Sequence, residues 1–247
     1  YEYVQNSKDV SVLDETFDAA RSVIYSFIER IDDTGLIADF KYPFWNFYEW
    51  SEGSDNGDQI SRKPDDFYPE QRDLILNCYF LFVLPLFKKL CEIRGESFTF
   101  DDEPMRKAVV KVFYDKDKQL FRANDREDKK FYTELGNALA VLCGLAGEET
   151  AERMLNDKDV VPITLSMNTY VYEALLKVNG QKYKHFILND IDKKYSRMLE
   201  QGATTFWETE KGAAALEHTG SLCHGWSAMP IYYYDLLNGK NYFNGKL

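Results

Sequence analysis

Long apolar runs and an excess of basic residues are both missing from this 247-residue sequence. The longest apolar run, residues 80–87, is interrupted by Pro85 and is far shorter than the roughly 20 residues that span a bilayer. Lys and Arg number 30 against 41 Asp and Glu, so the formal net charge is −11. Such a charge is unsuited to a nucleic-acid backbone or an anionic membrane surface. The sequence predicts no transmembrane helix and neither of these partners, and a neutral ligand is the better expectation.

Histidine and cysteine are also scarce, with 3 and 4 residues respectively. None of them has the spacing of metal ligands, so we expect no metal site and no cofactor. Cys78, Cys91 and Cys143 lie among apolar residues of expected helices, which favours buried thiols over disulfides. This cysteine usage leaves the compartment open, periplasmic and cytoplasmic alike.

The N-terminal residues 1–9 contain neither an initiator Met nor the apolar core of a signal peptide. The chain is therefore expected to be a piece of a longer protein. Apolar residues make up 45% and aromatic residues 15%, a composition typical of a globular chain and not of a disordered one. No shift in composition divides the sequence, so we expect one domain over residues 1–247.

Apolar residues recur at intervals of three and four over much of the chain, which predicts amphipathic helices. One short strand is expected at residues 119–122, and residues 125–130 read as a charged loop. Turns such as Asn179-Gly180 separate the helices, and no fixed-period repeat is visible. The predicted fold class is all-α, an irregular α/α toroid of helical hairpins. The expected helices are residues 14–31, 68–94, 103–114, 132–145, 148–155, 167–178, 183–199 and 222–237.

Residues 202–208 (GATTFWE) combine a flexible turn, two hydroxyls, two aromatic rings and one carboxylate. Glu208 directly follows Phe206 and Trp207, so its solvation is expected to be restricted, as in a general acid or base. The alternative is a structural carboxylate at a helix start or an ion pair with Lys211. The residues alone leave both interpretations open.

Two further clusters suggest a sugar site, because sugars need hydrogen-bonding groups beside exposed aromatic rings. In residues 45–50 (WNFYEW), Trp45 or Trp50 is a candidate platform and Glu49 a candidate partner for a hydroxyl. The alternative is an aromatic plug in the core. In residues 221–230 (SLCHGWSAMP), His224 is either a sugar ligand or a structural histidine, and Trp226 is expected to pack.

The patterns G-A-T-T-x-W-E and S-x-x-H-G-W-S-A resemble the closing part of bacterial α-L-rhamnosidase catalytic domains. The aromatic segment is similar to the W-x-F-x-D-W of that family, with Glu49 in place of the usual Asp. The resemblance implies a six-hairpin α/α toroid and an inverting glycosidase that removes terminal α-L-rhamnose from glycosides. It also implies that Glu208 is the general base and that Trp45, Glu49, Trp50, Trp207 and His224 bind the sugar.

The general acid of that family lies in a D-x-P-x-R-E type segment before the aromatic segment, and nothing before Trp45 matches it. Residues 69–73 (PEQRD) are similar by letters but follow the aromatic segment and are expected to begin a helix. The resemblance therefore implies that residues 1–247 are the later two thirds of the toroid. The acid and additional β-sandwich domains would lie elsewhere in the protein, and the isolated chain would be inactive.

Three alternatives remain open on the sequence. A related six-hairpin glycosidase acting on another sugar is the nearest. A helical carbohydrate-binding module without catalysis and a helical scaffold without a ligand are the others.

Overall fold

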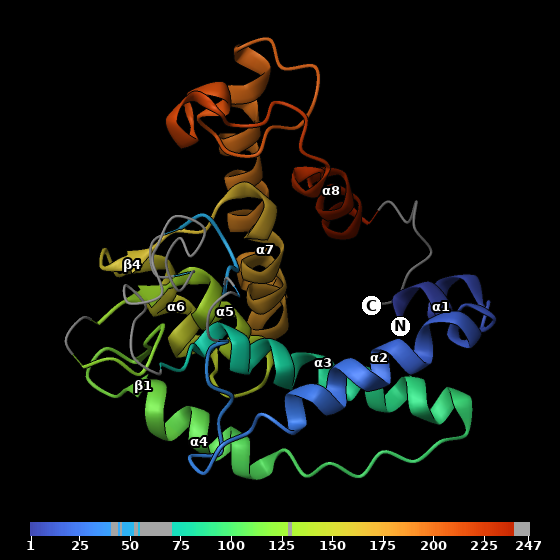
Figure 1. Cartoon of the computed structure of the whole chain (residues 1–247). Coiled ribbons are helices and arrows are strands. Elements are labelled where there is room, and N and C mark those ends of the chain that lie inside the picture. The colour runs from blue at the N-terminus through green and yellow to red at the C-terminus, as the bar shows by residue number, and fades with distance from the viewer. Residues whose placement is uncertain (41–43, 45, 52–53, 55–70, 128–129, 240–247) are drawn as a thin grey trace.

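The computed structural model describes residues 1–40, 44, 46–51, 54, 71–127 and 130–239 (Figure 1). It is mostly helical, with 59% helix and 6% strand, which confirms the all-α prediction. The chain opens with α1 (Glu2–Ser7) and α2 (Val12–Ile28), and α2 confirms the helix expected over residues 14–31. Leu13, Phe17 and Ile24 form the buried stripe of α2 and pack it onto α3.

Helix α3 (Leu74–Arg94) is the central core helix. The sequence predicted it from residue 68, whereas it begins after Asp73, which has an extended backbone; residues 68–70 lie outside the described part. By length and composition alone α3 is apolar enough to cross a membrane, contrary to the sequence expectation. However, 56% of its most apolar window is buried against the rest of the protein. Contacts with α2, α4 and α5 account for this apolar character.

Two short sheets lie between the middle helices. In the first, β1 (Tyr114–Asp115) pairs antiparallel with β2 (Leu120–Phe121), which confirms the strand predicted at residues 119–122. In the second, β3 (Tyr132–Thr133) pairs in parallel with β4 (Val160–Val161). The helices around them match the expected ranges and are α4 (Glu103–Phe113), α5 (Glu134–Leu142) and α6 (Glu148–Asn156).

Helix α7 (Asn168–Glu200) follows the short 3-10 turn η2 (Leu165–Met167). The sequence predicted two helices separated at Asn179-Gly180, and the structure confirms this, because the backbone of Asn179 is not helical (φ −164°, ψ 80°) and divides α7 into two helices. The second half of α7 and the loops after it project beyond the other helices (Figure 1). This part of the chain carries the motifs that suggested a sugar site.

The last helix, α8, covers only Pro230–Asn238. The prediction of a helix from residue 222 is wrong, because residues 222–229 form an irregular segment that includes η5 (Gly225–Ser227). The amide of His224 donates to Phe206 across the loop instead of entering a helix. Pro230 then occupies the first turn, where its missing N–H is not needed. Two more 3-10 turns precede this segment, η3 (Gly212–Ala214) and η4 (Leu216–His218).

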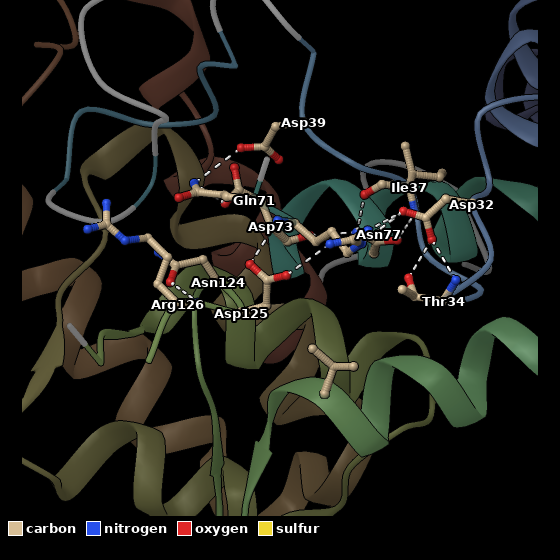
Figure 2. Close-up of polar contacts among 12 residues, drawn as sticks. Asp32, Thr34, Ile37, Asp39, Gln71, Asp73, Asn77, Asn124, Asp125 and Arg126 are labelled. Carbon is tan, nitrogen blue, oxygen red and sulfur yellow. Dashed lines mark hydrogen bonds and ion pairs between the residues drawn. The ribbon is translucent and has the colours of Figure 1, made fainter. Parts of the chain in front are cut away.

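An asparagine in the first turn of α3 and of α5 makes the same contact in both helices. Asn77 accepts a hydrogen bond from the amide of Ile37 (2.8 Å) and donates to its carbonyl (3.0 Å; Figure 2). Asn137 does the same with Phe121, at 2.8 Å and 3.1 Å. Each also donates to the carbonyl four residues earlier in its own chain segment. The starts of α3 and α5 therefore share one polar contact, although no sequence period reveals it.

The described cysteines are all unpaired thiols, as the sequence predicted. Cys78, Cys91 and Cys143 are buried, whereas Cys223 is exposed. The Cys143 thiol donates to the Cys78 carbonyl (3.2 Å), which joins α5 to α3 in the core.

Candidate active site

Tyr195, on the projecting half of α7, contacts both ends of the loop that carries the two motifs, residues 202–229. Its hydroxyl donates a 2.6 Å hydrogen bond to the Ser227 carbonyl. Its ring meets the ring of Phe206 edge-on, with the centroids 6.0 Å apart. The loop begins at Gly202, whose φ of +77° reverses the chain after α7. One helical side chain thus anchors residues 206 and 227, which lie on either side of Glu208 and His224.

Glu208 pairs with Ser221 through both its backbone and its side chain. The Glu208 amide donates to the Ser221 carbonyl (2.9 Å), and the Ser221 amide donates to Oε2 of Glu208 (3.0 Å). The His224 amide extends this pairing with a 2.7 Å bond to the Phe206 carbonyl. Glu208 is only 9% exposed. The two sequence motifs are therefore brought together in space, with an oriented and largely desolvated carboxylate between them.

Trp207 directly precedes Glu208 and is 7% exposed. Its ring fits against Gly212, where an added Cβ would lie only 2.7 Å from Cε3 of the ring. Gly212 also has a φ of +53°, which favours glycine. Trp207, predicted to bind sugar, is placed by the structure as a packing residue that fixes the backbone next to Glu208.

Trp226 is 79% exposed, in contrast to the packing role expected for it. Its ring meets the imidazole of His224 edge-on, with centroids 5.5 Å apart. An exposed aromatic ring beside a hydrogen-bonding ring is suited to a sugar, which has apolar C–H faces and polar edges. The sequence placed Trp226 in a candidate sugar-site motif, but it did not indicate that the side chain is exposed.

The aromatic segment is fixed at Asn46, whose side chain accepts from the Phe40 amide (2.8 Å) and donates to the Phe40 carbonyl (2.7 Å). Trp50 is 49% exposed, and its ring lies 4.6 Å from the ring of Phe47. Trp45, the other predicted platform, lies outside the described residues. Of the two candidate platforms, Trp50 is thus placed partly at the surface.

Glu49 is 2% exposed, and its Oε1 accepts a 2.9 Å hydrogen bond from the Thr164 amide. Its Oε2 is buried without a hydrogen-bond partner among the described residues. The turn η2, which begins directly after Thr164, packs against η5, which begins directly after His224. Glu49, η2 and the His224 loop are therefore neighbours in space.

The sequence analysis missed a pair of buried carboxyls, Asp39 and Asp73, beneath the aromatic segment. The Gln71 side-chain amide donates to both, at 3.1 Å and 2.8 Å (Figure 2). Burial, reinforced by the charge of Asp73, raises the pKa of Asp39 to about 10. Burial also raises the pKa of Asp73 to about 6, although hydrogen bonds from Asp39, Gln71 and Tyr48 oppose the rise. The pair therefore retains a proton near neutral pH.

The sequence contained a weak indication that these two carboxyl groups are buried, because each adjoins an apolar stretch. Asp39 directly follows the short apolar stretch 36–38, and Asp73 directly precedes the apolar start of α3. Nothing in the sequence indicated that the two positions meet.

A cavity of about 360 Å³ lies between α7, residues 203–206 and the start of α8. Its lining is mostly apolar and includes Tyr195, Met198, Phe206 and Pro230. Neither Glu208 nor His224 lines it. Within the described residues, no group of three or more His, Cys, Asp or Glu side chains is arranged to hold a metal ion. The cavity therefore borders the Glu208 and His224 loop through residues 203–206, and the candidate catalytic and binding side chains lie on that loop outside the cavity lining.

Two solved structures have a similar fold. The first is a GH78 family rhamnosidase of Bacillus sp. GL1, with a TM-score of 0.75 and 24% identity over 94% of this chain. The second is a rhamnosidase from Klebsiella oxytoca with rhamnose bound, with a TM-score of 0.69 and 17% identity over 96% of this chain. This chain covers 24% of the Bacillus chain and 44% of the Klebsiella chain. Among curated proteins no match is found.

A family model for the bacterial α-L-rhamnosidase six-hairpin glycosidase domain matches residues 1–235. The match includes the aromatic segment, the Glu208 motif and the His224 motif. It agrees with the mostly helical structure described above and with the two similar structures. The chain therefore belongs to the bacterial α-L-rhamnosidase six-hairpin glycosidase family.

Proposed function

We propose that this chain supplies the general base of an inverting α-L-rhamnosidase, and that Glu208 is that base. The observation that carries the proposal is the Glu208 carboxylate, largely desolvated and oriented by the Ser221 amide at 3.0 Å. In an inverting glycosidase the base takes a proton from the water that attacks the anomeric carbon. An acid about 6.5 to 9.5 Å away protonates the leaving oxygen. In this proposal the acid lies outside residues 1–247.

The same loop offers groups for binding the sugar. His224 presents a hydrogen-bonding ring and Trp226 an exposed apolar face, with their centroids 5.5 Å apart. The buried Oε2 of Glu49 has no hydrogen-bond partner among the described residues, so a hydroxyl donor there would remove a desolvation cost. Trp50 and Trp45 remain proposed platforms, and Trp207 supports Glu208 through packing. The proposed substrate is a rhamnose-containing glycoside.

The extent of the domain is part of the proposal. Residues 1–247 are proposed to form the later two thirds of the toroid, with further domains in the natural protein. The coverage of only 24% and 44% of the two similar chains supports the further domains.

The test is hydrolysis of an aryl α-L-rhamnoside by the natural polypeptide that carries this domain and by its Glu208→Gln variant. Circular dichroism checks that each variant folds. The matched control is Glu210→Gln, the same change two residues on, at a carboxylate that pairs with Arg197 at 3.2 Å. A lost general base costs roughly a hundredfold to ten-thousandfold in rate.

A folded Glu208→Gln variant that loses at least a hundredfold in kcat, beside an active control, supports the assignment. Equal activity of the two variants overturns Glu208 as the base. A polypeptide that binds rhamnose without hydrolysing any rhamnoside points to the carbohydrate-binding module. Hydrolysis of a different glycoside points to another six-hairpin glycosidase.

A further inference from the structure

Two carboxyl groups from distant parts of the chain, the buried one of Glu49 and the half-buried one of Glu134, bind neighbouring backbone amides. Oε2 of Glu134, the first residue of α5, accepts from the Ile163 amide at 2.8 Å. Oε1 of Glu49 accepts from the next amide, that of Thr164, at 2.9 Å. The two acceptors are 29 and 115 residues away from their donors in the sequence. The short segment 163–164 is therefore held from two sides by side-chain carboxyl oxygens.

The surroundings of Glu134 fix the position of its carboxyl group. Burial raises the pKa of Glu134, the Ile163 amide and the charge of Lys194 oppose the rise, and the charges of Asp190 and Glu49 add to it. Lys194 itself is fixed on α7 by Asp190 (2.7 Å) and by the Asn168 side chain (3.0 Å). A hydrogen bond from an amide to a desolvated carboxylate is about twice as strong as one between neutral groups. Glu134 is therefore suited to fixing the backbone that it touches.

The held segment leads directly to the candidate active site. Residues 163–164 continue into η2 (Leu165–Met167), which packs against η5 (Gly225–Ser227). Asn168, directly after η2, donates to the Thr164 carbonyl at 3.3 Å and closes this turn. On its other side η5 follows His224 and is held by Tyr195. A displacement of residues 163–164 would thus be passed through η2 to the His224 turn.

We propose that Glu134 is a positioning residue which, together with Glu49, fixes residues 163–167 and through them the turn that carries His224 and Trp226. Its importance for sugar binding rests on the proposed function of that loop. The two carboxyl oxygens of Glu49 differ in this arrangement. Oε1 accepts from the Thr164 amide, and Oε2 has no hydrogen-bond partner among the described residues. Glu134 needs no contact with the substrate to have its effect.

Hydrogen exchange measured by mass spectrometry on the natural polypeptide that carries this domain tests this without requiring catalysis. Glu134→Ala removes the acceptor, whereas Glu134→Gln keeps an oxygen for the Ile163 amide. We expect exchange of peptides covering residues 163–167 and 224–228 to rise about tenfold or more in the Ala variant, and to return close to wild type in the Gln variant. Glu103→Ala is the matched control, because Glu103 is also the first residue of a helix but is exposed and pairs with Lys107.

Faster exchange confined to residues 163–167, with 224–228 unchanged, overturns the proposal. So does a uniform increase over α2 and α3, which would show a loss of global stability instead of positioning. If circular dichroism shows that Glu134→Ala does not fold, Glu49→Gln and Glu49→Ala give the same comparison at the Thr164 amide. The outcome is separable from the proposed function: coupled exchange can hold while Glu208→Gln leaves hydrolysis intact, and the reverse can also occur.

Discussion

The Ser221 amide lies 3.0 Å from Oε2 of Glu208, and the Ser221 carbonyl accepts from the Glu208 amide at 2.9 Å. This reciprocal pairing orients the carboxylate by main-chain atoms, which have far less conformational freedom than a side chain. Ser221→Pro removes the amide donor. We expect kcat for rhamnoside hydrolysis by the natural polypeptide to fall about tenfold to a hundredfold, since hydrogen bonds to charged groups contribute about 1.5 to 3 kcal/mol. Ser221→Ala keeps the amide and serves as the control; equal rates for the two variants would contradict the role of the pairing.

The packing of Trp207 on Gly212 gives a second prediction. A methyl group at residue 212 would meet the ring at 2.7 Å, whereas at Gly202 it would meet nothing within 4 Å. Both glycines have positive φ, at +53° and +77°, so Gly202→Ala controls for backbone strain. We expect Gly212→Ala to lower the free energy of unfolding by about 1 to 3 kcal/mol more than Gly202→Ala. Urea titration followed by tryptophan fluorescence measures both, and equal losses would show that the contact is loose.

The carboxyl pair of Asp39 and Asp73 predicts an unusual dependence of stability on pH. Burial raises both pKa values above the value of about 3.9 in an unfolded chain, to about 10 and about 6. The folded state therefore favours the protonated forms. Their stabilisation is complete at low pH and is lost as the pH rises, first through about 6 for Asp73 and then toward about 10 for Asp39.

We expect the free energy of unfolding of the wild-type chain to fall by at least about 1.4 kcal/mol between pH 6 and pH 9, the equivalent of one pKa unit. Asp39→Asn imitates the protonated member of the pair and should reduce this fall. The measurement is urea unfolding at several pH values, with Asp33→Asn as a control outside the pair. A wild-type profile that is flat over this range, or a fall equally steep in Asp39→Asn, would contradict the shared proton.

The contacts of Asn77 in α3 and Asn137 in α5 are expected to be among the strongest polar contributions to stability. Asn77→Ala leaves the buried amide and carbonyl of Ile37 without their partners, at a cost of at least about 2 kcal/mol. Asn156→Ala is the matched control, because Asn156 also donates to the carbonyl four residues earlier but is exposed. Thermal and urea unfolding measure the difference, and similar losses for both variants would show that the contact to Ile37 contributes little.

Trp226 provides a prediction in which stability and binding separate. Because the ring is exposed, Trp226→Ala should change the free energy of unfolding by no more than about 0.5 kcal/mol. If the ring stacks on a sugar, the Kd of the natural polypeptide for L-rhamnose should rise about twofold to tenfold. Trp207→Ala, in contrast, should lower the free energy of unfolding substantially, because Trp207 is 7% exposed. Calorimetric titration gives the affinities, and an unchanged Kd in Trp226→Ala would remove Trp226 from the proposed site.

Much of the fold was predictable because a helix can be recognised from the spacing of apolar residues close together in the sequence. The ranges of α2, α4 and α6 followed from apolar residues at intervals of three and four, and β2 from a short apolar stretch. The prediction failed at residues 222–229, where apolar residues at helical spacing are used in a loop. There the His224 amide bonds to the Phe206 carbonyl, and this long-range pairing overrides local preference.

The sequence by itself determined the helical class, the two motifs that meet at Glu208, and the family to which they point. Only the tertiary structure decided which polar groups meet: Glu49 with an amide 115 residues away, and Asp39 with Asp73 around Gln71. It also decided that Trp207 is 7% exposed and Trp226 79% exposed, although both stand in similar motifs. The physical reason is that burial and charge interactions depend on distances between segments far apart in the chain, whereas helical periodicity depends on neighbours.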